Sequence, residues 1–296
     1  MPQSHDRAGT EGASVTPSNS LQNGLSAGEH GDLKARYERD GFIYPLDVMS
    51  AQDAAGYRAQ LEAAEARYGD EKTFRQALRR YPNLVLPFVD EVTRLPAVTD
   101  AVAALLGPDL LALDAPFFIK EPRTDAYVSW HQDLHYWGLE SDEEVTAWIA
   151  LSAATPASGC MRFVAGSHRT RVEHRDTFAA DNLLTRGQEI AVDVDEADAS
   201  EAALQPGQMS LHHGRVFHAS HPNGSDERRI GLAVRFIPTR ARQTEGANMA
   251  AMLVRGEDRY GHFRSCERPR AIMDPAAVAH WQEIAGARNK VMMGNG

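Results

Sequence analysis

The sequence predicts a mainly β fold with flanking helices, built around a double-stranded β-helix, or jelly roll. Seven short β-favouring runs occupy the middle of the chain, separated by clusters of Gly, Pro, Asp and Ser. Such spacing is typical of an antiparallel barrel or sandwich rather than of alternating strands and helices. With 43% hydrophobic residues the chain can bury a sizeable core. The expected strands are Leu110–Lys120, Tyr127–Gln132, Val145–Leu151, Met161–Val164, Glu189–Val194, Gln208–His212 and Ile230–Ile237.

Most helical patterns precede these strands. The first begins near Asp32 and leads into an extended stretch at residues 41–45. Ser50 is a suitable N-cap for a helix over Ala51–Tyr68, in which small or apolar residues recur at helical spacing. The remaining expected helices are Thr73–Tyr81, Asp90–Leu106 (closed by Gly107-Pro108) and Pro275–Ala287.

The chain is expected to form one domain after a polar tail. Residues 1–30 are rich in Ser, Gly, Asn and Gln, so we expect them to be disordered. The single domain is expected over residues 31–296, with a helical part at about 31–108, the β-helix core at about 109–240, and a C-terminal loop and helix at 241–296. Residues 254–263 lack a core pattern and suit either a polar connecting loop or a lid.

Composition excludes several classes of protein. A net charge of -10 and a pI near 5.6 argue against a nucleic-acid binder, which normally carries a basic patch. Two cysteines, Cys160 and Cys266, are too few for a disulfide framework and indicate a reducing compartment. No apolar signal segment or membrane-spanning run is visible, so we expect a cytoplasmic protein with no membrane partner. A homo-oligomer remains an open alternative.

A candidate metal site lies in Trp130-His131-Gln132-Asp133, at the end of an expected strand. Residues i and i+2 of a strand point to the same side, so His131 and Asp133 can converge on one ion. An imidazole and a carboxylate suit a first-row transition metal. Alone this triplet is weak, because H-x-D also occurs in surface loops. A second His-rich strand followed by arginine strengthens it, since arginine can clamp a carboxylate in a bidentate pair.

Three ordered blocks resemble the signature blocks of the phytanoyl-CoA dioxygenase family. They are His131–Tyr136, Gly159–His168 and His218–Arg229, and the likeness covers roughly residues 35–240. The resemblance implies a double-stranded β-helix and an Fe(II)/2-oxoglutarate-dependent dioxygenase. Such an enzyme hydroxylates an unactivated C–H bond of a small metabolite and converts 2-oxoglutarate to succinate and CO2. Fe(II) would be the metal, with 2-oxoglutarate and O2 as co-substrates.

The resemblance also implies roles for individual residues. His131, Asp133 and His218 match the family's iron ligands, His218 because a small residue and a serine follow it. Arg229 matches the arginine that binds the 5-carboxylate of 2-oxoglutarate, and Ser220 is expected to add a hydrogen bond there.

Four further residues are assigned more loosely. Lys120 resembles a co-substrate-binding lysine of ectoine hydroxylases, and Trp148 matches a tryptophan in the co-substrate pocket of phytanoyl-CoA hydroxylase. His135 and Tyr136 are candidate substrate contacts, with packing at the barrel mouth as the alternative.

Neighbouring residues compete for these roles. His212, His213 and His221 share the segment of His218, and the last two are expected around the site or on the surface. Arg228 is the rival of Arg229, because strand alternation turns only one of them inward. The inward face of Arg229 continues through small residues, which leave room for a packed co-substrate, so we place Arg229 inside.

Other functions remain as alternatives. Related halogenases have Ala or Gly at the position of Asp133, so this residue favours oxygenation. The same triad can serve desaturation, cyclisation or epimerisation in natural-product biosynthesis. A non-catalytic cupin-like module would bind a metal or ligand without turnover, but it would need no carboxylate-clamping arginine. The expected partner is a small-molecule substrate, whose identity the sequence does not indicate.

Overall fold

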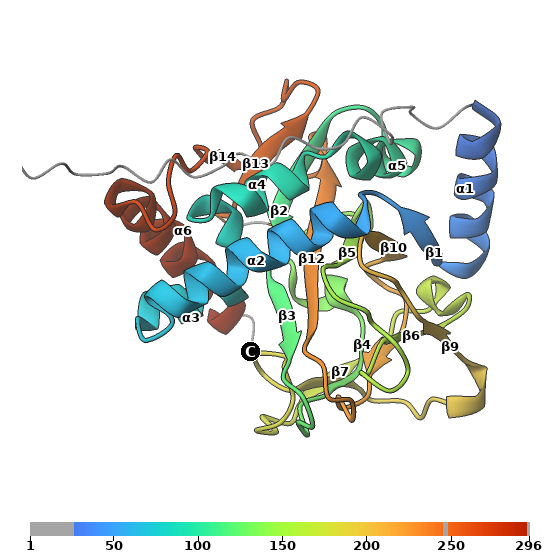
Figure 1. Ribbon diagram of the computed structural model, residues 1–296. Coiled ribbons are helices and arrows are strands. Elements are labelled where there is room, and N and C mark those ends of the chain that lie inside the picture. Colours follow the sequence, from blue (N-terminus) through green and yellow to red (C-terminus); the bar gives the residue numbers. More distant parts are fainter. Residues whose placement is uncertain (1–26, 245–247, 295–296) are drawn as a thin grey trace, which may run out of the picture.

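Two β-sheets form the centre of the molecule in the computed structural model, which describes residues 27–244 and 248–294 (Figure 1). In spatial order the larger sheet contains β1 (Phe42–Asp47), β10 (Gln208–His213), β5 (Val145–Ala150), β12 (Arg229–Pro238), β2 (Leu110–Asp114), β13 (Ala250–Arg255) and β14 (Arg264–Ser265), and β3 (Phe117–Lys120) pairs with β12. The smaller sheet contains β4 (Val128–His131), β11 (His218–Ser220), β6 (Met161–Val164) and β9 (Ala199–Ala202). β7 (His174–Asp176) and β8 (Gln188–Ile190) form a separate pair. The predicted mainly β, jelly-roll fold is confirmed.

Helices cover the outer face of the larger sheet (Figure 1). They are α1 (Ala27–Asp40), α2 (Ala51–Tyr68), α3 (Lys72–Arg79), α4 (Pro87–Thr93) and α5 (Pro96–Leu106), and α6 (Pro275–Gly294) follows the strands. Ser50 caps α2 as predicted, because its side chain accepts a hydrogen bond from the Asp53 amide. Apolar side chains of α2, α4 and α5 share one core cluster with the outward-facing residues of β12. This packing leaves the opposite face of β12 free to line the space between the two sheets.

β12 shows this division residue by residue. Ile230, Leu232 and Val234 belong to the core cluster beneath the helices. Ala233 belongs instead to the inner cluster with Trp148 of β5, its direct cross-strand neighbour. Successive side chains of a strand point to opposite faces, so the residues with odd numbers face the interior.

Two elements that were predicted as continuous are each divided in the structure. The helix expected over Asp90–Leu106 is divided into α4 and α5, because Pro96 lacks an amide hydrogen and starts a new helix. The strand expected over Leu110–Lys120 is divided into β2 and β3 at Ala115-Pro116 for the same reason.

The larger sheet also extends beyond the expected core segment. β1 pairs with β10 at one side, and β13, which was not predicted, pairs with β2. Residues 1–26 of the predicted tail lie outside the described residues, and residues 27–30 belong to α1. The division of the chain into tail and domain stays a prediction. Over the described ranges, no helix combines the length and apolarity needed to cross a membrane.

Candidate metal centre

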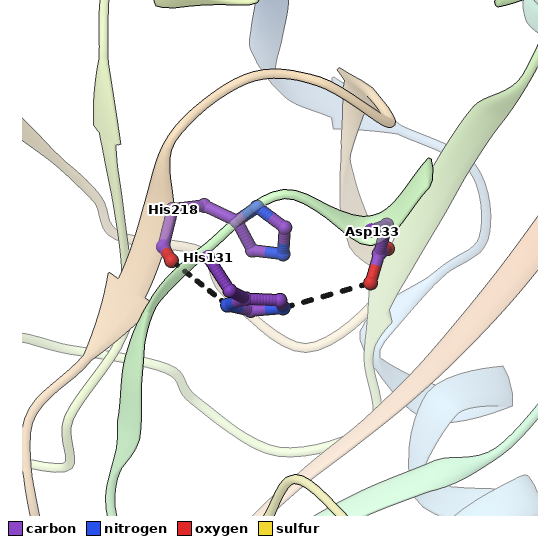
Figure 2. Close-up of side chains that lie close together, drawn as sticks. All are labelled: His131, Asp133 and His218. Atoms are coloured by element: carbon purple, nitrogen blue, oxygen red, sulfur yellow. Dashed lines mark hydrogen bonds and ion pairs between the residues drawn. The ribbon is translucent and has the colours of Figure 1, made fainter. Parts of the chain in front are cut away.

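Three buried side chains meet at neighbouring strands of the smaller sheet (Figure 2). His131 ends β4, His218 begins β11, and the two residues pair directly across these strands. Asp133 begins the 3-10 turn η3 (Asp133–Tyr136). One ligand atom from each of the three lies within 4.8 Å of the others, and Nε2 of His131 is 3.5 Å from Oδ1 of Asp133. The predicted set therefore comes together, but the turn, and not strand alternation, directs the Asp133 carboxylate.

Backbone carbonyls fix the orientation of both imidazoles. Nδ1 of His131 lies 2.9 Å from the carbonyl oxygen of Ser129 and 3.1 Å from that of His218. Nδ1 of His218 lies 3.0 Å from the carbonyl oxygen of Val216. A carbonyl only accepts hydrogen bonds, so each Nδ1 carries a hydrogen and each Nε2 is the nitrogen left to face a metal. Burial, with the nearby histidine rings, holds the pKa of His218 well below its usual value, which favours the neutral, metal-binding form.

Asp133 is held as a carboxylate. Burial alone would raise its pKa, but Arg235 and the neighbouring histidines outweigh burial and hold the pKa well below its usual range. Thr146 donates a hydrogen bond to Oδ2 of Asp133 at 3.3 Å. Two imidazoles and one carboxylate, all buried, form a donor set that fits Fe(II) in a non-haem oxygenase site.

Two cationic side chains lie side by side near this centre. Arg229 and Lys120 are cross-strand neighbours on β12 and β3, and their exposed fractions are 1% and 0%. Arg229 donates to the carbonyl of Gly159 at 2.7 Å, yet its Nε has no partner, and no carboxylate in the described part of the chain forms an ion pair with it. Lys120 donates to Oγ of Ser220 at 2.7 Å and to the carbonyl of His221.

Burial lowers the pKa of Arg229 to about 10, and burial followed by repulsion from Arg229 lowers the pKa of Lys120 to about 6. A buried arginine and a charged lysine beside it are costly together unless an anion joins them. Their placement suits a ligand that brings a carboxylate into this space.

Trp148 packs against this pair. The Arg229 guanidinium carbon lies 5.2 Å from the centre of the indole. The indole lies over Gly231, where a Cβ atom would come within 2.5 Å of Cη2 and closer still to two other ring atoms. A glycine is therefore required at residue 231 for the indole to take this position.

Arg228 lies on the outer face, as strand alternation predicted. It forms ion pairs with Glu65 of α2 at 3.0 Å and with Glu121 at 2.9 Å. These two carboxylates hold Arg228 away from the interior, so Arg229 is the arginine that faces it.

Two spaces that share lining residues reach the metal centre. A narrow cavity of about 30 Å³ is lined by the triad and by Trp148, Arg229 and Ser220 among others. A wider cavity of about 460 Å³ is lined by His131 and Asp133, and by Phe117, Phe118 and Leu183 among others. None of residues 254–263 lines either space, so the structure does not support the lid alternative for that segment.

Some predicted residues lie elsewhere. His135 lines neither of these two spaces and stacks on His174 with ring centres 4.4 Å apart. The side chain of Tyr136 lies outside the described residues. Among the rival histidines, His213 accepts a hydrogen bond from the Arg215 amide at 2.9 Å, and Nε2 of His221 lies 2.7 Å from Arg162. Neither of these two rivals belongs to the group of converging ligand atoms.

Sequence reasoning missed two residues of the centre. Arg235 lies 3.5 Å from Oδ1 of Asp133 and lines both cavities. His212 is buried with Nε2 3.9 Å from Oδ2 of Asp133, and neither ring nitrogen has a hydrogen-bond partner among the described residues. The available signal was strand alternation, because Arg235 shares its face with Arg229 and His212 is on the inner face of β10.

Comparisons with known proteins agree with this geometry. Residues 37–231 match the phytanoyl-CoA dioxygenase (PhyH) family. The chain is 26% identical over 215 residues to a probable alpha-ketoglutarate-dependent hypophosphite dioxygenase of Stutzerimonas stutzeri, covering 70% of this chain and 72% of that protein. It spans about half the length of some other curated relatives.

Two solved structures are similar over most of the chain. The apo form of the non-heme monooxygenase ThoJ superposes with a TM-score of 0.81 and 34% identity, covering 89% of this chain and 98% of ThoJ. The ThoJ–Ni complex superposes with a TM-score of 0.76 and 31% identity, covering 89% of this chain and 99% of that one. The family match and the buried His–Asp–His set are consistent with Fe(II) and 2-oxoglutarate as cofactors. The chain therefore belongs to the phytanoyl-CoA dioxygenase family of Fe(II)/2-oxoglutarate oxygenases.

Proposed function

We propose that this protein hydroxylates an unactivated C–H bond of a small molecule, with His131, Asp133 and His218 as its iron ligands. The observation that carries the proposal is the convergence of three buried ligand atoms within 4.8 Å of one another. When Fe(II) and 2-oxoglutarate are bound, one oxygen atom of O2 enters the substrate as hydroxyl and the other enters succinate, with loss of CO2. The protein supplies the positions and charges for this reaction.

Arg229 and Lys120 are proposed to hold the 5-carboxylate of 2-oxoglutarate. Both are buried, and no carboxylate of the described residues pairs with Arg229. Ser220 already accepts a hydrogen bond from Lys120, which directs Nζ of Lys120. Trp148 limits the width of this space and lies over Arg229. The carbonyl contacts of the two histidines keep their Nε2 atoms directed at the centre.

Two alternatives are weaker. Desaturation, cyclisation or epimerisation would use the same triad and differ only in the substrate, and nothing in the cavity favours them over hydroxylation. A non-catalytic metal-binding module gives no reason for a buried arginine and lysine that have no acidic partner among the described residues. Asp133 also favours oxygenation over halogenation, because a carboxylate fills the position that a halide would need. We expect the enzyme to work in the reducing cytoplasm, where Cys160 and Cys266 would remain thiols.

Anaerobic absorption spectroscopy tests the proposal. Fe(II) and then 2-oxoglutarate are added to metal-free protein, and we expect a weak visible charge-transfer band. His218→Ala should lose the band, and Arg229→Ala should require more 2-oxoglutarate to reach it. Arg228→Ala is the matched control and should titrate as the unmodified protein does. Bound Fe(II) without any band would refute the oxygenase assignment, and succinate release with candidate substrates then identifies the reaction.

A further inference from the structure

Arg235 is a second buried arginine on the inner face of β12. Its exposed fraction is 6%, and its Cα lies about 20 Å from that of Arg229 at the usual rise of a strand. Both arginines line the narrow cavity that contains the triad. The metal centre is therefore flanked by two guanidinium groups, one of which is already assigned to the co-substrate.

The contacts of Arg235 leave most of its hydrogen-bonding capacity unused. One terminal nitrogen lies 3.5 Å from Oδ1 of Asp133, and the other lies 3.5 Å from the carbonyl oxygen of Ala233. Nε has no partner in the described part of the chain. A guanidinium has five N–H donors, and buried donors are normally satisfied. Two long contacts do not satisfy it.

Asp133 compensates the charge of Arg235 only in part. It is the one carboxylate among the described residues that forms an ion pair with Arg235. The same oxygen lies 3.5 Å from Nε2 of His131 and faces the proposed metal position. A carboxylate shared with a divalent ion has less charge to offer a guanidinium, so Arg235 can accept a further anion.

Arg235 also faces the wider cavity, which does not include Arg229 among its lining residues. That cavity holds about 460 Å³, and Pro116, Phe117, Phe118, Ile119, Leu183 and Leu184 form its apolar walls. Trp137 also lines this cavity, and the Arg235 guanidinium carbon lies 4.7 Å from its indole centre. The cavity is also lined by Arg75, Arg79, Arg80 and Arg288. Arg235 forms an ion pair with Asp133, so it lies where this cavity reaches the metal centre.

The acidic side chains of the cavity wall are already engaged. Glu65 and Glu121 pair with Arg228 at 3.0 and 2.9 Å, and Asp114 pairs with Arg288 at 3.1 Å. These pairs leave little negative charge to repel an anion or to recognise a cation. The charge that remains unmet beside the centre is positive.

We propose that the wider cavity takes a substrate with an apolar body and an anionic group, either a carboxylate or a phosphorus oxyanion, and that Arg235 binds this group. The inference rests on the proposed function, because it assigns the cavity to the substrate of that reaction. A bidentate pair between Arg235 and the anion fixes the substrate in one orientation, so that a C–H bond near the anionic group faces the metal centre.

Calorimetric titration of the anaerobic protein, loaded with Fe(II) and saturating 2-oxoglutarate, tests the inference. The probes are benzoate, phenylphosphonate and the neutral benzamide. We expect the two anions to bind about tenfold or more tightly than benzamide. Arg235→Gln should remove this preference, and Arg235→Lys should keep part of it, since lysine retains the charge but not the bidentate geometry. The affinity for 2-oxoglutarate should fall more in Arg229→Gln than in Arg235→Gln.

The outcomes distinguish whether Arg235 binds the carboxylate of the co-substrate or the anionic group of the substrate. If Arg235→Gln weakens 2-oxoglutarate and leaves benzoate unchanged, Arg235 serves the co-substrate and the inference is overturned. Equal binding of benzoate and benzamide to the unmodified protein also overturns the inference. Because this comparison uses the unmodified protein alone, its result does not depend on whether a variant folds. A charge-transfer band without anion preference leaves the proposed function intact, whereas bound Fe(II) without a band removes both.

Discussion

Gly231→Ala adds a single methyl group and should weaken the binding of 2-oxoglutarate in its proposed space. The added Cβ would lie 2.5 Å from Cη2 of Trp148 and nearer to two more ring atoms. Carbon atoms in contact are about 3.5 to 4 Å apart, so the indole must move by about 1 Å or more. Trp148 is buried between the two sheets and has little room to do so.

The magnitude follows from this overlap. Overpacking a well-filled core by one methyl group costs about 1 to 3 kcal/mol of unfolding free energy. For a domain of this size each kcal/mol lowers the melting temperature by about 2 to 4 °C. The displaced indole also disturbs Arg229, which lies 5.2 Å from its centre. Losing a good charged hydrogen bond costs about 1.5 to 3 kcal/mol, so we expect the dissociation constant of 2-oxoglutarate to rise about 10- to 100-fold.

Thermal unfolding and anaerobic titration of the charge-transfer band measure the two effects. Gly224→Ala is the matched control, because its Cβ would meet only the Ala157 carbonyl oxygen at an ordinary 3.6 Å. Combining Gly231→Ala with Trp148→Phe should recover stability, since the smaller ring frees the space that the methyl group needs. Unchanged stability and 2-oxoglutarate affinity in Gly231→Ala would show that the indole does not lie over residue 231.

Three further outcomes are expected. Binding of 2-oxoglutarate at pH 7.5 should be accompanied by the uptake of about one proton. Burial and Arg229 lower the pKa of Lys120 to about 6, and a bound carboxylate should raise the pKa of Lys120 again. Calorimetry in two buffers of different ionisation enthalpy measures this uptake, and Lys120→Met should abolish it; identical enthalpies for the unmodified protein would contradict the assignment. His212→Phe should stabilise the metal-free protein by about 1 kcal/mol in urea unfolding, because it removes two buried nitrogens that lack partners among the described residues. A loss of stability would contradict this expectation. Arg228→Gln should lower the free energy of unfolding, measured in urea, by at most about 1 kcal/mol, since the ion pairs of Arg228 with Glu65 and Glu121 are partly exposed. Weaker 2-oxoglutarate binding in this variant would mean that Arg228, and not Arg229, faces the interior.

The parts of the fold and site that were predicted correctly follow from local sequence patterns. The strand of Met161–Val164 and the helix of Ala51–Tyr68 have the predicted bounds, because turn residues and the Ser50 cap mark their ends. His131 and Asp133 were recognised together because they are neighbours in sequence. The turn that directs Asp133 was not foreseen, since its geometry depends on Leu134, whose amide bonds to the distant Gly214 carbonyl.

Arg235 shows what local patterns cannot supply. Its position on the face of Arg229 followed from strand alternation, but its partners, Asp133 and Trp137, come from a segment far away in the sequence. Whether a buried arginine is fully paired or has donors to spare depends on distances of a few tenths of an ångström across the two sheets. Such distances follow from the packing of the whole core and not from any one segment.

The inner face of β12 can nevertheless be interpreted as a unit, because each of its residues has a separate physical reason. Arg229 stands beside Lys120, where the 5-carboxylate of the proposed co-substrate can bind both side chains. Gly231 and Ala233 are small because the Trp148 indole fills the space above them. Arg235 is the next residue on this face after Ala233, and it contacts Asp133. A larger residue at either small position would push the indole into the co-substrate space. Packing therefore requires small residues between the two arginines. With the indole above these residues, both guanidinium groups line the narrow cavity that contains the triad.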